Sequence, residues 1–173
     1  MKTMIILILS LTVFACSSQS LDDYANTSPR FDVESYFKGP LQAQGIVLDR
    51  GGKVTRRFTV EMLGTWQGTR GKLEEWFIFD DGEKTTRTWR ITKLSDGRYS
   101  GTAGDVVGTA DGESGGFALH WDYQLDLPYD GKLVRVTFDD WLYQVDTNVV
   151  INRSFITKWG FRVGEVILVI TKK

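Results

Sequence analysis

The chain has 173 residues, of which 42% are apolar and 25% are charged, and its formal net charge is −1. This length supports one domain, and the apolar fraction excludes a wholly disordered chain. The small net charge argues against binding through bulk electrostatics, so we expect no nucleic-acid partner. One Cys and one His are too few for a disulfide framework or a Cys/His zinc site, and we predict no metal or other cofactor.

The first sixteen residues have the pattern of an export signal. Lys2 precedes an apolar run, Met4 to Ala15, which is too short to span a bilayer because 12 helical residues rise about 18 Å and the hydrocarbon core is about 30 Å thick. The run ends in Val13-Phe14-Ala15-Cys16, which resembles a bacterial lipobox. We predict that residues 1–15 are a lipoprotein signal peptide and that Cys16 is lipidated. The alternative is an ordinary secretory signal with an incidental thiol.

The residues after the Cys indicate where the protein is anchored. Ser17 and Ser18 follow Cys16, and the absence of an Asp there favours the outer membrane over the inner membrane. Residues 16–30 are polar without periodicity, which predicts a tether. We therefore expect a lipid-anchored protein that faces the periplasm, with one folded domain over residues 31–173.

The folded part is predicted to be almost entirely β. Residues 31–37 predict one or two helical turns, and from residue 41 apolar and polar residues alternate with the period of a strand. Pairs such as Asp-Gly, which favour hairpin turns, separate the candidate strands. These strands are 41–49, 53–63, 72–79, 84–94, 98–108, 115–126, 132–145, 149–157 and 161–171. Long strands joined by short turns predict an antiparallel up-and-down barrel of eight to ten strands, similar to lipocalins and other calycins, with a short N-terminal helix.

Strand alternation also predicts which charged side chains point into the barrel. Asp140 alternates with Val136 and Phe138, and Arg153 alternates with apolar residues of the next strand. A short turn joins these strands, so we predict an interior Asp140–Arg153 ion pair, because either charge alone is costly to bury. The same rule places further charged and aromatic side chains inward: Glu75, Arg87, Asp105, Trp89, Trp121 and Tyr123. His120 falls on the polar outer face, where a structural role is expected.

Several motifs occur in a fixed order along the chain. They are Asp49-Arg50-Gly-Gly52, Asp81-Gly-Glu83, Arg87-Thr-Trp89, Gly101-Thr-Ala-Gly-Asp105-Val-Val-Gly108, Asp139-Asp-Trp141, Asn152-Arg153 and Lys158-Trp-Gly160. Together they resemble the proteobacterial lipoprotein family known as domain of unknown function 3833, from about residue 31 to the C-terminus. Where that family usually has Gly-Asn-Ala, this chain has Gly116-Phe-Ala118. The resemblance implies no established activity.

Three functions are consistent with these features. The first is a non-enzymatic binding protein that holds an apolar or acyl-type ligand inside the barrel, with the arginines of the interior polar seam on an anionic head group. The second is an envelope interaction or scaffold protein whose interior ions are structural and whose exposed patch lies around Trp141 and Tyr143. The third is a cofactor-free isomerase or hydratase for lipid-like substrates that uses Asp105 or Asp140. We expect binding rather than catalysis, and no catalytic residue is assigned.

Overall fold

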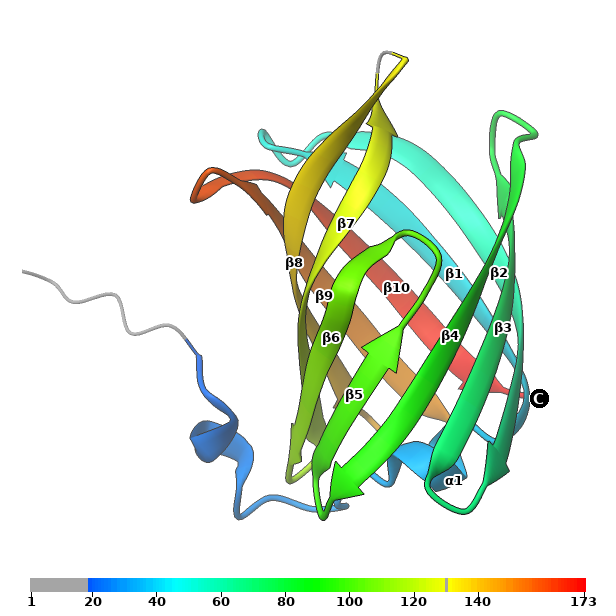
Figure 1. Cartoon of the computed structure of the whole chain (residues 1–173), viewed down its shortest axis with the longest axis vertical. Helices are drawn as coiled ribbons and strands as arrows, with labels where there is room; N and C mark the ends of the chain where they lie inside the picture. Colours follow the sequence, from blue (N-terminus) through cyan, green and yellow to red (C-terminus); the bar gives the residue numbers. More distant parts are fainter. Residues whose placement is uncertain (1–18, 130) are drawn as a thin grey trace, which may run out of the picture.

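The computed structural model describes residues 19–129 and 131–173, and these residues form ten antiparallel strands that close into a barrel (Figure 1). Each strand pairs with its neighbours in the chain, and β10 pairs with β1 to close the barrel. The strands are β1 (Gly39–Asp49), β2 (Val54–Gln67), β3 (Arg70–Phe79), β4 (Lys84–Ser95), β5 (Arg98–Thr102), β6 (Val106–Gly115), β7 (Ala118–Tyr129), β8 (Lys132–Gln144), β9 (Val149–Lys158) and β10 (Phe161–Lys172). The predicted antiparallel barrel is confirmed, whereas the signal peptide and Cys16 lie outside the described residues.

The largest departure from the predicted strands lies between residues 98 and 115. The expected strand 98–108 is two strands, because Ala103, Gly104 and Asp105 form a turn in which Val106 N–H donates to the Ala103 carbonyl at 3.2 Å. Strand β6 then continues to residue 115, so the region holds one strand more than the sequence pattern indicated. The Gly-Asp pair, a common turn signal, lies within an alternating segment and was hidden by it.

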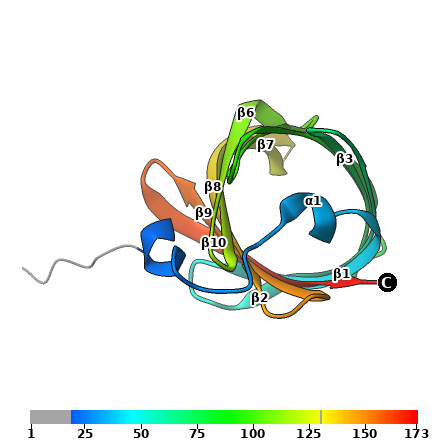
Figure 2. The ribbon, with the colours of Figure 1, turned by 90° about the horizontal axis from the view of Figure 1, so that it is seen from below.

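The N-terminal helix is at the lower end of the predicted one or two turns. It is the single turn α1 (Val33–Tyr36), which lies across one end of the barrel (Figure 2). Its buried residues Val33 and Tyr36 close this end, and the Tyr36 hydroxyl donates to the Ile170 carbonyl at 2.8 Å. Strand β2 approaches the segment after α1 so closely that a Cβ at Gly64 would lie 1.6 Å from the Phe37 carbonyl oxygen. Glycine is therefore required at position 64.

The opposite end of the barrel, which we call the mouth, is less tightly packed. The turns after β1, β3, β7 and β9 lie at this end (Figure 1). Side chains that point inward near the mouth are only partly buried, although most are apolar and face the core: Val47, Phe77, Phe79, Val106, Leu127, Val134, Val166 and Leu168. Solvent therefore reaches the inner wall from the mouth, while the α1 end is sealed.

The segment before α1 docks on the outside of the barrel, so residues 19–30 do not form the expected tether. It contains the 3₁₀ turn η1 (Leu21–Tyr24), and the Tyr24 ring contacts Phe117, Trp141 and Tyr143 with centroid distances of 5.1, 6.1 and 5.9 Å. The otherwise polar sequence carries its anchoring residue at Tyr24, whose partners are remote in the chain. As a result Trp141 is only 3% exposed, and the patch expected around it is covered.

Candidate functional site

A group of polar side chains crosses the barrel interior between the sealed core and the mouth, and we call it the polar belt. Its members come from β3, β4, the turn before β6, β7, β8 and β9: Glu75, Arg87, Asp105, Tyr123, Asp140, Asn152 and Ser154. Strand register brings them to similar levels, since Glu75 is paired with Arg87 and Asp140 with Ser154. The belt therefore follows from sheet geometry.

One half of the polar belt is an ion cluster around Arg87. Its Nε donates to Glu75 Oε2 at 2.7 Å, and its Nη1 donates to Asp105 Oδ2 at 3.5 Å. Burial raises the pKa of the Glu75 carboxyl, and the positive charge of Arg87 opposes that shift. Arg87 therefore has two carboxylate partners within the protein.

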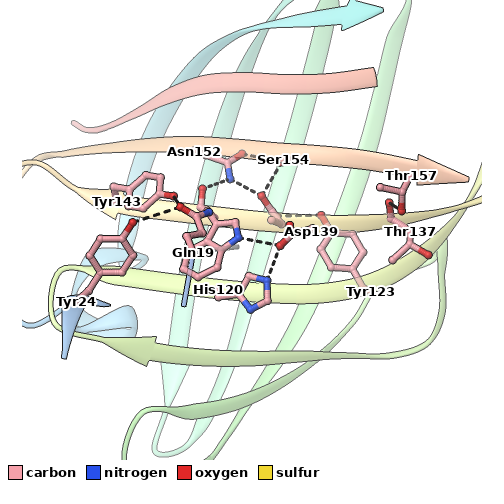
Figure 3. Close-up of polar contacts among 12 residues, drawn as sticks. Gln19, Tyr24, His120, Tyr123, Thr137, Asp139, Tyr143, Asn152, Ser154 and Thr157 are labelled. Carbon is pink, nitrogen blue, oxygen red and sulfur yellow. Dashed lines mark hydrogen bonds and ion pairs between the residues drawn. The ribbon is translucent and has the colours of Figure 1, made fainter. Parts of the chain in front are cut away.

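The other half of the polar belt is built around Asp140. Its carboxylate accepts hydrogen bonds from Tyr123 Oη at 3.0 Å, from Ser154 Oγ at 2.6 Å and from Asn152 Nδ2. Figure 3 shows Tyr123, Asn152 and Ser154 converging at this point. Burial raises the pKa of Asp140, although these neutral donors favour its ionised form. Burial also raises the pKa of Tyr123 well above its ordinary value, so the phenol remains a donor.

Aromatic rings border the polar belt. Trp89 meets the edge of Tyr123 at a centroid distance of 5.4 Å and lies 6.2 Å from Trp121, so all three predicted aromatic residues are inside the barrel. Trp121 lies directly over β6, where a Cβ at Gly112 would come within 2.7 Å of the indole. The belt thus lies among flat apolar surfaces that suit an apolar ligand.

The predicted Asp140–Arg153 ion pair is wrong. Arg153 lies on the outer face of β9 with its side chain 49% exposed, and its Nε donates to Glu165 Oε1 of β10 at 2.5 Å. Its guanidinium also lies 4.6 Å from the centre of the Phe155 ring. The inward residues of β9 are instead Val150, Asn152, Ser154 and Ile156.

Two features of β9 explain this error. Its outer face carries Ile151 and Phe155, so apolar residues occur on both faces and alternation alone selects the wrong one. Its inner face carries Asn152 and Ser154. Because both side chains are polar, the alternation pattern predicts that they point outward. The sequence feature that could have indicated their direction is Asp140 on the adjacent strand, because a carboxylate that points inward requires hydrogen-bond donors from neighbouring strands.

A further residue that sequence reasoning missed stands at the mouth. Arg56 lies with its guanidinium carbon 3.6 Å from the centre of the Phe79 ring. Its Nη2 donates to Asp81 Oδ2 at 2.9 Å and to Glu83 Oε2 at 2.8 Å. The Asp81-Gly-Glu83 motif could have indicated this arginine, because two acidic residues at a turn favour a basic side chain on the adjoining strand.

His120 lies on the outer face, as predicted. Its Nε2 is 2.7 Å from Asp139 Oδ1, which also accepts from Trp141 Nε1 at 2.8 Å, and the imidazole stacks on the indole at 4.3 Å (Figure 3). A shallow pocket of about 480 Å³ adjoins these three residues and is also lined by Gln19 and Phe155. This cluster holds the outer wall together and lies across the wall from the polar belt.

The charges of the polar belt define its chemistry. Three carboxyl groups, those of Glu75, Asp105 and Asp140, surround the single guanidinium of Arg87. Within the described residues, Asp105 Oδ1 is buried and has no hydrogen-bond partner. The belt is therefore rich in acceptors. Among residues 19–129 and 131–173, no group of three or more His, Cys, Asp or Glu side chains has the arrangement of a metal site.

Comparison with solved structures supports the fold assignment. The chain is similar to an S-type phycobiliprotein lyase from Guillardia theta, with a TM-score of 0.58 and 10% sequence identity over 90% of this chain and 98% of that one. A redesigned β-barrel gives a TM-score of 0.44 with 9% identity, covering 81% of this chain and 94% of that one. An odorant binding protein gives 0.39 with 15% identity, covering 84% and 77% respectively. At 10% identity the likeness to the lyase shows the barrel fold alone.

Sequence comparison identifies the family. No curated protein matches the chain. Among the described residues, no helix is both long and apolar enough to span a membrane. A family model matches residues 10–172, which include every member of the polar belt. The chain therefore belongs to the family described as protein of unknown function (DUF3833).

Proposed function

We propose that this protein binds an apolar, acyl-type ligand inside its barrel, with the ligand entering through the mouth. The observation that carries the proposal is the partly buried apolar inner wall between the polar belt and the mouth. Phe77 and Phe79, for example, point inward with their rings stacked at 6.1 Å, yet both remain accessible to solvent. Covering such surface with an apolar ligand is favourable by about 25 cal/mol per Å².

The polar belt supports a ligand whose polar end is uncharged. Because Arg153 lies outside the barrel, Arg87 is the belt's guanidinium, and Glu75 and Asp105 already neutralise it. An anionic head group would therefore meet an excess of carboxylates, contrary to the expectation from sequence. A hydroxyl or amide N–H could instead donate to Asp105 Oδ1, which has no partner among the described residues.

We further propose that the protein is held at the outer membrane by lipid on Cys16 and faces the periplasm. The support is the sequence of residues 1–18, which combines an apolar run with the chain's single Cys. Binding rather than catalysis is the proposed role, because the polar groups around Asp140 are engaged with one another and hold the barrel wall in register.

A chain-length-matched pair of ligands tests the proposed binding. Protein purified from its native membranes is analysed by native mass spectrometry, and its organic extract is searched for apolar compounds. A long-chain fatty alcohol and the fatty acid of equal length are then compared by titration. We expect the alcohol to bind at least about tenfold more tightly, equivalent to about 1.4 kcal/mol, because the acid places a carboxylate at the acidic belt.

Two Val→Trp variants locate the ligand. Val106 points inward near the mouth, whereas Val169 is 42% exposed on the outer face of β10. Val106→Trp should reduce binding of the alcohol about tenfold by filling the lumen, and Val169→Trp should leave it unchanged. Protein that carries no apolar compound and binds neither lipid would overturn the proposed function.

A further inference from the structure

The largest exposed apolar side chains gather at two hairpin tips on the mouth end. Among the described residues, Trp159 (86% exposed), Tyr129 (74%), Leu133 (70%) and Phe161 (68%) are the most exposed large hydrophobic residues. Tyr129 and Leu133 belong to the β7–β8 hairpin, and Trp159 and Phe161 to the β9–β10 hairpin, at the upper end in Figure 1. Large apolar groups that are exposed at protruding hairpin tips suit an interaction surface.

The tip of the β9–β10 hairpin has an exposed Trp at a backbone conformation that bulky residues rarely adopt. Lys158 pairs with Phe161, so Trp159 and Gly160 form a two-residue turn with φ values of +52° and +80°. Such turns favour Asn-Gly, because a bulky side chain is strained at positive φ. Trp159 is the one non-glycine residue with positive φ in the described part of the chain. An exposed indole at a strained position indicates a role outside the barrel's own packing.

The surroundings of this tip suit a lipid surface. Lys158 and Arg162 flank the aromatic pair. Arg162 is paired with Glu165, whereas the Lys158 ammonium lies 4.6 Å from the Trp159 ring and is the basic group at the tip. Aromatic rings with adjacent basic groups are typical of the interface of an anionic membrane, where the rings lie at headgroup depth.

The position of the N-terminal segment supports the same partner. Gln19 and Phe155 line the same shallow outer pocket. Phe155 is on β9, four residues before Trp159 in the sequence. In Figures 1 and 2 the N-terminal segment and the β9–β10 hairpin lie on the same flank of the barrel. Four strand residues span about 13 Å. The three-residue separation from Gln19 to Cys16 can reach about 10 Å. Given the proposed lipid at Cys16, on which this support rests, the anchor and the hairpin tip can meet one membrane surface.

We propose that the β9–β10 hairpin tip, defined by residues 158–162, inserts Trp159 and Phe161 into the surface of a lipid bilayer. The β7–β8 tip with Tyr129 and Leu133 provides a second contact at the same end. This arrangement holds the mouth against the membrane. It stands independently of whether the barrel carries a ligand, because the tips lie outside the lumen.

Photocrosslinking in the full-length chain tests the contact directly. A photoreactive phenylalanine analogue replaces Trp159 in one variant and Trp76 in a matched control. Trp76 is 44% exposed on the outer face of β3, on the wall away from the β9–β10 hairpin. In intact cells we expect phospholipid adducts at position 159 and none at position 76. Protein adducts alone at 159, or equal lipid labelling at both positions, would overturn the proposal.

A vesicle experiment separates membrane contact from folding. All strand pairings and the buried core lie within residues 19–172, so a chain that begins at Gln19 contains the whole barrel. Its binding to phosphatidylethanolamine/phosphatidylglycerol vesicles is measured by flotation. Trp159→Asn should reduce partitioning about tenfold while leaving thermal stability equal or higher, because Asn suits the turn.

Trp76→Thr removes an indole from the far wall and should leave partitioning unchanged. If Trp159→Asn lowers thermal stability, the indole has a structural role and the proposal fails. Wild-type partitioning by Trp159→Asn would also overturn it. A barrel that carries no apolar compound and binds neither the fatty alcohol nor the fatty acid, yet contacts vesicles through Trp159, would refute the proposed function and leave this inference intact.

Discussion

Asp140 and Arg153 lie on opposite faces of the barrel wall, although they occupy paired strands. Asp140 is opposite Ser154 in the register of β8 and β9, whereas Arg153 is opposite Trp141. A single position along a strand therefore separates an interior carboxylate network from an outer ion pair with Glu165. This relationship determines which charges a ligand in the lumen would meet.

Arg153→Ala should have a small effect. The Arg153 side chain is 49% exposed, and Glu165 retains Arg162 as a second partner. Glu165 is itself buried, with its side chain 9% exposed, but it keeps Arg162 as its cation, so we expect a loss of unfolding free energy of about 1 kcal/mol, with unchanged ligand binding. Urea denaturation and ligand titration check this. A loss of about 3–5 kcal/mol would be the signature of a broken interior pair instead.

Arg87→Met should be strongly destabilising, because it leaves the Glu75 carboxylate buried without its cation. Glu75 is 6% exposed, and we expect a loss of about 3 kcal/mol. The double variant Glu75→Met/Arg87→Met should recover much of the lost unfolding free energy, because it removes both charges and retains apolar volume. Chemical denaturation of the two single variants and the double variant measures the coupling. Additive losses would show that the two side chains are not energetically paired.

Asp140 should make stability depend on pH. Burial raises its folded-state pKa, so the folded chain binds this proton more tightly than the unfolded chain does. Its contribution to stability is then greatest below the ordinary Asp pKa of about 4 and is lost as pH rises through the raised value. We expect the unfolding free energy of wild type, measured relative to that of Asp140→Asn, to increase as the pH is lowered. Subtraction removes the shared titration of the other carboxylates, and a difference that is flat with pH would contradict the assignment.

Tyr24→Ala should release the N-terminal segment from the barrel wall. Tyr24 contacts the rings of Phe117, Trp141 and Tyr143, and each aromatic contact is worth about 0.5–1.5 kcal/mol. We expect several-fold faster tryptic cleavage after Arg30 under native conditions. Tyr129→Ala serves as the control, because Tyr129 is 74% exposed at the mouth and should leave this cleavage rate unchanged. Equal rates in both variants would mean that the segment is held by other contacts.

The local sequence carried most of the fold. Alternation and Asx-Gly turns predicted an antiparallel barrel, and they placed Glu75, Arg87 and Asp140 on its inner face. This succeeded where each strand has one apolar face, as in β7, because burial of that face then determines the direction of every side chain. The family assignment likewise followed from short motifs.

Tertiary structure decided the features that depend on partners remote in the chain. Arg153 lies outside because Asn152 and Ser154 serve Asp140 from a neighbouring strand, and Tyr24 docks because three aromatic rings meet beside β7 and β8. Periodicity reports only whether one face of a strand is apolar. When both faces carry apolar residues, or when a polar residue is buried by its hydrogen bonds, the direction is set by contacts that exist only in the closed barrel.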